Sequence, residues 1–172
     1  MACALTQGFT LGCRDNVGGI KTVYIIELAN VSSFSPSDLS GTLTAITMSG
    51  GAKFWTYNME KETASLEESI QTNDANGTVF YEPTLTMPFR KMQASSRNEL
   101  KLLAQNLIAA IVLDRNGKYW ACGFKNGLEL QPSKIMTGKA MGDFNGYELT
   151  LKGKEEVPCQ EITSSIIAAI IQ

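Results

Sequence analysis

The densest cluster of reactive side chains in the sequence is acidic and consists of Glu60, Glu62, Glu67 and Glu68. Two carboxylates can act as general acid and general base when an apolar pocket or a cation shifts their pKa values apart. The sequence around these glutamates indicates neither, so we interpret them as a solvated strand face. Histidine is absent from the chain, which excludes Ser–His and Cys–His catalysis. We therefore expect no catalytic residues and no enzymatic activity.

The second group of side chains that could take part in chemistry consists of the cysteines, Cys3, Cys13, Cys122 and Cys159. They form no CxxC pair, and no histidine is present to complete a zinc site, so we predict no metal site. No Walker loop or GxGxxG motif is present either, and we predict no cofactor. The first residues do not resemble a signal peptide, so the thiols are expected to be reduced, with Cys122 as a small buried apolar side chain.

The balance of charge and apolar residues points away from DNA and membranes. The chain has 15 Lys plus Arg against 17 Asp plus Glu, which leaves no basic excess for holding phosphates. A basic group at Arg90, Lys91, Arg97 and Lys101 could bind an anion or face an acidic strand of a neighbouring copy. The longest apolar run, residues 166–171, is far shorter than a membrane helix of about 20 residues. With only 19% charged residues, some of the surface is expected to pack against other chains.

Hydrophobic periodicity predicts a mainly β fold in which residues 1–172 form a single domain. About eight to ten short strands favour an antiparallel β-sandwich or partly closed barrel. One flanking α-helix is expected at about residues 96–106, where leucines recur at helical spacing and Ser96 with Glu99 fits a capping box. Residues 1–19 are interpreted as a possible N-terminal arm, and the strand that follows is expected to be covered on both faces.

Residues 65–87 are predicted to form a long hairpin that turns at Asp74–Gly77. Its second strand places Val79, Pro83 and Leu85 on one side. Because Pro83 has no N–H to donate, this strand is expected to be an edge strand or to carry a bulge. A two-stranded ribbon is marginal in water and gains stability against a neighbouring subunit, although an ordinary internal hairpin is the equal alternative.

Residues 162–172 are predicted to form a C-terminal strand, because they are uncharged and rich in isoleucine. An exposed edge of this kind aggregates unless the fold or a neighbour pairs with it. The hairpin and this strand are therefore our candidate assembly interface, through Asp74, Asn76, Gly77, Pro83, Leu85, Ile166, Ile167, Ile170 and Ile171.

Five stretches of the chain resemble phage tail tube (major tail) proteins in their order. They are KETASLEESIQTNDANGTVFYEPTLTMPFRKM, RNELKLLAQN, AIVLDRNGKYWACG, NGLEL and GDFNGYELTLKG. The resemblance is to small structural proteins of phages, especially phages of Bacteroidetes-like hosts, and it covers roughly residues 20–155. It contains no catalytic motif.

This resemblance implies a tail-tube-like β-sandwich that assembles with itself into six-fold rings, which stack around a channel for genome ejection. It further implies other phage tail proteins as partners, DNA that passes without specific binding, and a location in the virion tail after synthesis in the host cytoplasm. One alternative is another virion role, as tail terminator, head–tail joining or capsid-associated protein. The other is a monomeric ligand-binding β module that exposes Trp55, Tyr57 or Trp120.

Overall fold

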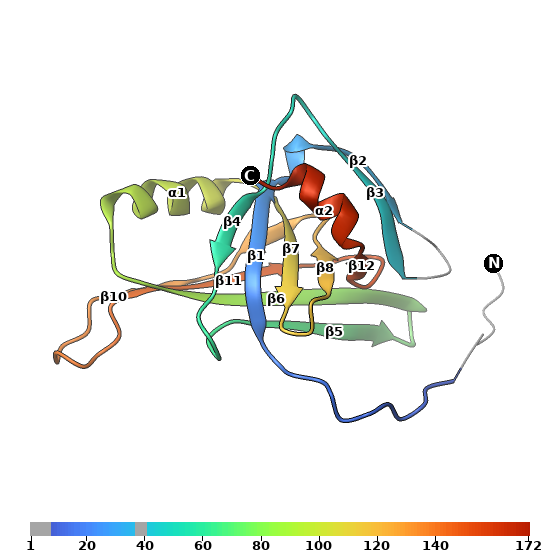
Figure 1. Ribbon diagram of the computed structural model, residues 1–172, viewed down its shortest axis with the longest axis horizontal. Coiled ribbons are helices and arrows are strands. Elements are labelled where there is room, and N and C mark those ends of the chain that lie inside the picture. The colour runs from blue at the N-terminus through green and yellow to red at the C-terminus, as the bar shows by residue number, and fades with distance from the viewer. Residues whose placement is uncertain (1–7, 37–40) are drawn as a thin grey trace.

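A computed structural model describes residues 8–36 and 41–172, and Figure 1 shows how the elements are arranged. The expected part of the N-terminal arm at residues 1–7, including Cys3, lies outside the described residues. The elements in chain order are β1 (Ile20–Glu27), a 3-10 helix (Leu28–Asn30), β2 (Val31–Pro36), β3 (Thr42–Met48), β4 (Trp55–Asn58), β5 (Ser65–Asn73), β6 (Thr78–Arg90), α1 (Ala94–Gln105), β7 (Ile108–Asp114), β8 (Tyr119–Cys122), β9 (Leu128–Leu130), β10 (Lys134–Met136), β11 (Gly146–Gly153), β12 (Gln160–Ile162) and α2 (Ser164–Ile170).

The strands form one hydrogen-bonded sheet in the order β2-β3-β12-β8-β7-β9-β11-β6-β5, with β1 between β7 and β4, and with β10 on β11. The sheet is mixed, because β12 pairs in parallel with β3. It folds over on itself, so that β1 and β7 run steeply across β6 and β11 (Figure 1). The prediction of a mainly β, sandwich-like fold with a flanking helix is confirmed, whereas the sheet does not close into a barrel.

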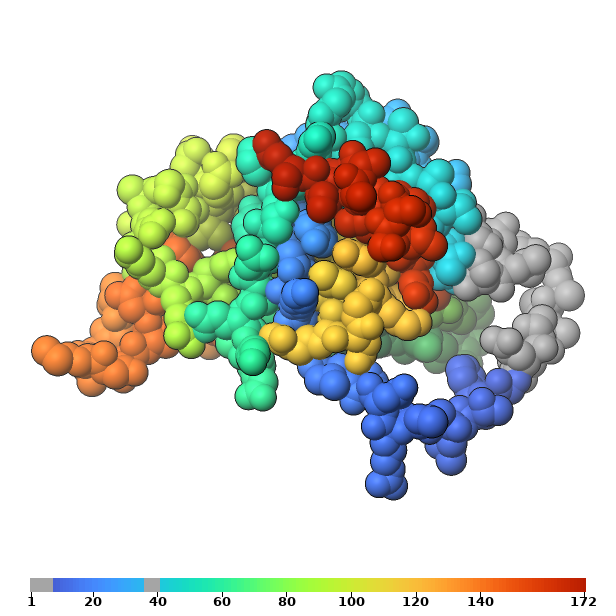
Figure 2. Space-filling model, in the orientation of Figure 1, coloured from blue at the N-terminus to red at the C-terminus, as the bar shows by residue number. Residues whose placement is uncertain are grey.

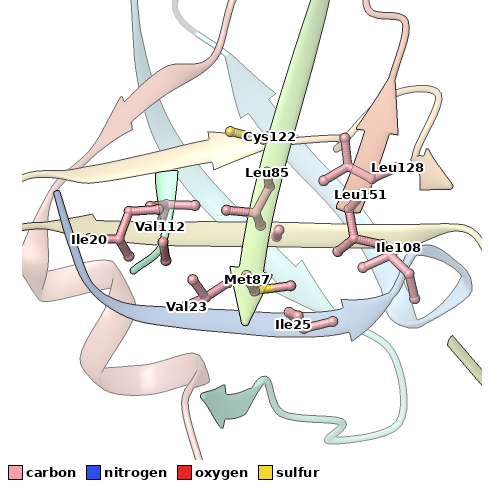
Figure 3. Packing of buried hydrophobic residues seen from close by; sticks show 12 residues of the cluster. Ile20, Val23, Ile25, Leu85, Met87, Ile108, Val112, Cys122, Leu128 and Leu151 are labelled. Atoms are coloured by element: carbon pink, nitrogen blue, oxygen red, sulfur yellow. The ribbon is translucent and has the colours of Figure 1, made fainter. Parts of the chain in front are cut away.

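Apolar side chains cover both faces of the central strands β1 and β7. Val23 of β1 faces Leu85 and Met87 of β6 across one layer of the core (Figure 3). The alternate residues Tyr24 and Ile26 face a second layer, which α2 and β3 cover from the other side. This arrangement explains why residues 20–27 read as a nearly continuous apolar run, as expected for a strand buried on both faces.

Helix α1 begins at Ala94, two residues before the predicted start at about residue 96. Its N-cap is Gln93 and no side chain caps the helix, so the expected capping box of Ser96 and Glu99 is absent. Ser96 lies inside the first turn, where it cannot act as the cap. No residue of α1 is fully buried, so the helix lies on the surface of the sandwich.

The predicted C-terminal strand over residues 162–172 is wrong, because β12 ends at Ile162 and the helix α2 follows it. Isoleucines at positions 166, 167, 170 and 171 lie on one side of a helix as readily as along a strand, since four residues make about one helical turn. Two central alanines favour the helix. Ile167 and Ile170 are buried in the second core layer, so the tail is covered by its own fold.

The expectation for Pro83 is also corrected, since β6 lies between β5 and β11 and β5 is the edge strand. The register of β6 with β11 runs to Thr84, and the next bridge joins Tyr81 to Glu155. Pro83 lies in the gap between these two contacts, where the sheet requires no N–H from it.

Candidate assembly surface

Two faces of the β5–β6 hairpin differ sharply in chemistry. On the inner face the register aligns Leu66 of β5, Leu85 of β6, and Leu151 of β11 in one row. Leu85 and Leu151 are buried, and they form part of the core with β1 and β7. The inner face therefore forms part of the hydrophobic core, and residues paired across neighbouring strands contribute to it together.

The same inner face continues beyond the body of the protein, where none of the described residues covers it. Ile70 is paired with Tyr81, and Val79 with Thr72, further along the hairpin. Ile70 is 64% exposed and Val79 55% exposed, although their side chains point to the same side as Leu85. Apolar side chains thus continue past the last residue that the protein's own core buries, with Glu68 and Thr72 of β5 beside them on the same face.

The tip and the outer edge of this hairpin are free to contact another chain. The predicted turn is confirmed at residues 74–77, all of which are exposed. Asn73 accepts a hydrogen bond from the Asn76 N–H at 3.2 Å, and Gly77 has a φ of +60°, which a glycine adopts without strain. Within the described chain, β5 ends the strand order, so one of its backbone edges faces outward.

The outer face of the hairpin sheet is polar. One row aligns Glu67, Thr84, Lys152 and Glu129 across β5, β6, β11 and β9. On the same face Glu82 pairs with the Lys152 ammonium at 3.1 Å. Glu82 is also 3.9 Å from the Lys154 ammonium, so Glu67, Glu82 and Glu129 outnumber Lys152 and Lys154 here, and this part of the face has no excess of positive charge to bind phosphate.

Residues 8–18 run outside the sandwich as an extended segment, which Figure 2 shows as the blue stretch below the body. Phe9 and Leu11 are fully exposed. The base of the segment is fixed, because the Val17 N–H donates to the Asn116 side chain at 2.9 Å and Asn116 donates back to the Val17 carbonyl at 3.0 Å. An open hollow of about 800 Å³ separates this segment from the start of β5 and the β7–β8 turn.

A second projection lies at the opposite end of the molecule. Residues 137–145 link β10 to β11 and extend away from the body (orange in Figures 1 and 2). Met141 in this loop is fully exposed. The loop is ordered by Asp143, whose carboxylate accepts the N–H groups of Lys139 and Ala140 at 2.8 and 2.9 Å. These two hydrogen bonds lower the pKa of Asp143.

The structure separates the predicted interface residues into two groups. Asp74, Asn76 and Gly77 lie together at the exposed hairpin tip. The others belong largely to the protein's own interior: Pro83, Leu85, Ile167 and Ile170 are buried, and Ile166 and Ile171 are half-buried. Sequence reasoning missed the exposed Ile70, Val79, Phe9 and Met141. The alternation of side chains along the two strands could have identified Ile70 and Val79, because it places both on the same face as Leu85.

The remaining candidate groups do not converge on a ligand site. Among the described residues, no three Cys, Asp or Glu side chains are placed to hold a metal ion. Trp55 and Tyr57 line a small cavity of about 40 Å³ against α1, whereas Trp120 lies elsewhere, hydrogen-bonded to Asp114 at 3.2 Å. In the acidic cluster, Glu60 pairs with Arg90 at 2.7 Å while Glu68 accepts the backbone N–H of Cys159.

Neither helix in the described part of the chain has the length and apolarity that crossing a membrane would require. Comparison of the chain with protein families, curated proteins and solved structures yields no match.

Proposed function

We propose that this chain is a structural protein of a phage virion that assembles with itself into stacked rings, which form the tail tube. The observation that carries the proposal is the inner face of the β5–β6 hairpin, which continues from buried Leu85 to exposed Ile70 and Val79. The order of sequence stretches that resembles tail tube proteins supplies the family context.

A second copy of the chain is the natural cover for this face. A neighbour that covers Ile70 and Val79 buries apolar surface at about 25 cal/mol per Å² and extends the core across the subunit boundary. The outward edge of β5 can add backbone hydrogen bonds to the same contact. If the hairpin face of one copy contacts a different surface of the next, such as the exposed segment at residues 8–18, the contact is head-to-tail and either closes rings or builds open stacks.

The polar outer face of the hairpin sheet suits the wall of a channel for DNA. Glu67, Glu82 and Glu129 stand beside Lys152 and Lys154 on this face, so a passing phosphate meets more carboxylates than ammonium groups. A basic wall would hold the genome through counterion release, whereas this wall does not.

Electron microscopy of the purified chain tests the proposal. We expect hollow tubes of stacked rings from the wild type, and no assembly from the variant Ile70→Asp/Val79→Asp, because a charge on the hairpin's inner face must be desolvated in the contact. The matched control is Ser69→Asp/Thr78→Asp, which places the same two charges on the outer face of the same two strands and should still give tubes.

Three outcomes contradict the proposal or change it. Wild-type chain that stays monomeric at high concentration refutes self-assembly and favours the ligand-binding module. Single closed rings without stacking favour a tail terminator or head–tail joining protein. Tubes from the Ile70→Asp/Val79→Asp variant would show that the hairpin face is not the contact.

A further inference from the structure

Two cysteines that are 37 positions apart in the chain meet at the boundary of β8 and β12. Cys122 ends β8 and Cys159 directly precedes β12. The register pairs Gln160 with Ala121 and Glu161 with Trp120, so one step further along the same antiparallel register places Cys159 opposite Cys122. Directly opposed cross-strand residues have Cβ atoms about 4.5–5.5 Å apart, close to the separation that a disulfide spans.

The two sulfur atoms are in direct contact. The distance between the Cys159 Sγ and the Cys122 Sγ is 2.7 Å. Non-bonded carbon atoms keep about 3.5–4.0 Å, and sulfur is the larger atom. Both thiols are free in the structure. The two sulfur atoms are therefore close enough to form a disulfide without a rearrangement of the strands.

The surroundings hold the pair in place and leave one of its two thiols partly exposed. Cys122 is buried in the first core layer, whereas Cys159 is half-buried. Both line a small cavity of about 20 Å³. The backbone of Cys159 is fixed from the hairpin, because its N–H donates to the Glu68 carboxylate at 2.7 Å. The hydrogen bond with Cys122, burial and the nearby Glu68 carboxylate raise the pKa of the Cys159 thiol, so the thiolate that attacks a disulfide is a small fraction of the Cys159 population at neutral pH.

We propose that Cys122 and Cys159 form a reversible intrachain disulfide, with a low-molecular-weight disulfide as oxidant, and that this bond fastens the C-terminal segment to the core. The Cys159 thiolate attacks one sulfur of the small disulfide and releases its other half as a thiolate. The Cys122 thiolate then attacks the Cys159 sulfur of the mixed disulfide and releases the second half. The two cysteines lose two electrons and two protons, and the small disulfide becomes two thiols.

A disulfide at Cys159 affects the segment that follows it in the chain. The strand β12 pairs with β3 and β8, and α2 follows it to cover the second core layer. In the reduced protein this segment is held by hydrogen bonds and packing alone, whereas a disulfide ties its start to β8. The inference concerns the single chain and does not depend on the proposed assembly.

The test treats the native wild-type chain with excess oxidised glutathione, blocks free thiols and digests the protein with trypsin. Cleavage after lysine or arginine places Cys122 in peptide 119–125, Cys159 in peptide 155–172, and both other cysteines in peptide 1–14. We expect peptides 119–125 and 155–172 to be linked, and dithiothreitol to separate them. In the variant Cys3→Ser/Cys13→Ser, which keeps only this pair, we expect oxidation to raise the melting temperature on the order of 10 °C, as closing a loop of this length predicts.

The control Cys159→Ser, in the same background, should show no link and no rise in melting temperature. The proposal is overturned if both thiols stay free or carry separate glutathiones in the folded chain. It is equally overturned if the link forms only after denaturation in urea, or if the linked protein melts at the same temperature as the reduced one.

Discussion

Leu85 and Ile70 lie on the same face of the hairpin, but truncation to alanine should affect folding at Leu85 and assembly at Ile70. Leu85→Ala removes side-chain atoms from a residue that is 0% exposed, and Ile70→Ala removes them from a residue that is 64% exposed. Both side chains point to the same side of the hairpin, in a register that pairs Leu66 with Leu85 and Ile70 with Tyr81. The comparison therefore separates folding of the single subunit from its assembly.

The expected magnitudes follow from burial. Leu85→Ala loses buried side-chain atoms and leaves a cavity, which lowers the free energy of unfolding by about 2–5 kcal/mol. Ile70→Ala should change that free energy by about 0.5 kcal/mol or less, because its surface is already in water. In an assembly, covering the exposed two-thirds of Ile70 contributes about 1–2 kcal/mol per contact, so Ile70→Ala should weaken the contact by about 5- to 30-fold.

Urea unfolding of dilute subunit measures the first quantity, and the critical concentration for assembly by light scattering measures the second. The reasoning is refuted if Ile70→Ala destabilises the single subunit as strongly as Leu85→Ala. It is also refuted if Ile70→Ala leaves the critical concentration unchanged.

Two further predictions concern the C-terminal half of the chain. Ile167→Ala should lower the free energy of unfolding by about 2–5 kcal/mol, because Ile167 anchors α2 in the core, whereas Ile166→Ala on the half-buried side should cost clearly less; equal losses in urea unfolding would argue against the helix. Burial raises the pKa of the Glu155 carboxyl above its ordinary 4.5, although backbone N–H groups of residues 125–127 lower it in part. The folded chain then holds this proton more tightly than the unfolded chain, so the stability that Glu155 contributes is greatest below pH 4.5 and declines as pH rises through the folded pKa. The difference in unfolding free energy between the wild type and Glu155→Gln, measured at a series of pH values, should fall over that window, and a rise there would contradict the assignment.

The sequence was sufficient to predict those elements that depend only on residues close together in the chain. The hairpin turn at residues 74–77 combines Asp, Asn and Gly, which turns require, and the structure has a turn there. The apolar run of β1 indicates burial on both faces, and the structure buries Val23 and Tyr24 in opposite layers.

The isoleucine-rich tail is the element for which local signals conflict. Isoleucine favours strands, whereas spacing by one helical turn and two alanines favour a helix. The contacts of Ile167 and Ile170 with the second core layer decide between them, and those partners come from strands far away in the chain. The meeting of Cys122 and Cys159 is decided in the same way, by the register of β8 with β12.

The sequence by itself determined which residues are apolar, where the chain turns, and that the fold is mainly β, because these properties depend on neighbours within a few positions. Only the tertiary structure decided where the core ends. Leu85 and Ile70 share one face of the hairpin, yet other strands cover Leu85, whereas no strand in the described part of the chain covers Ile70. Burial depends on what packs against a residue, and that is set by contacts between distant segments rather than by the residue's own pattern.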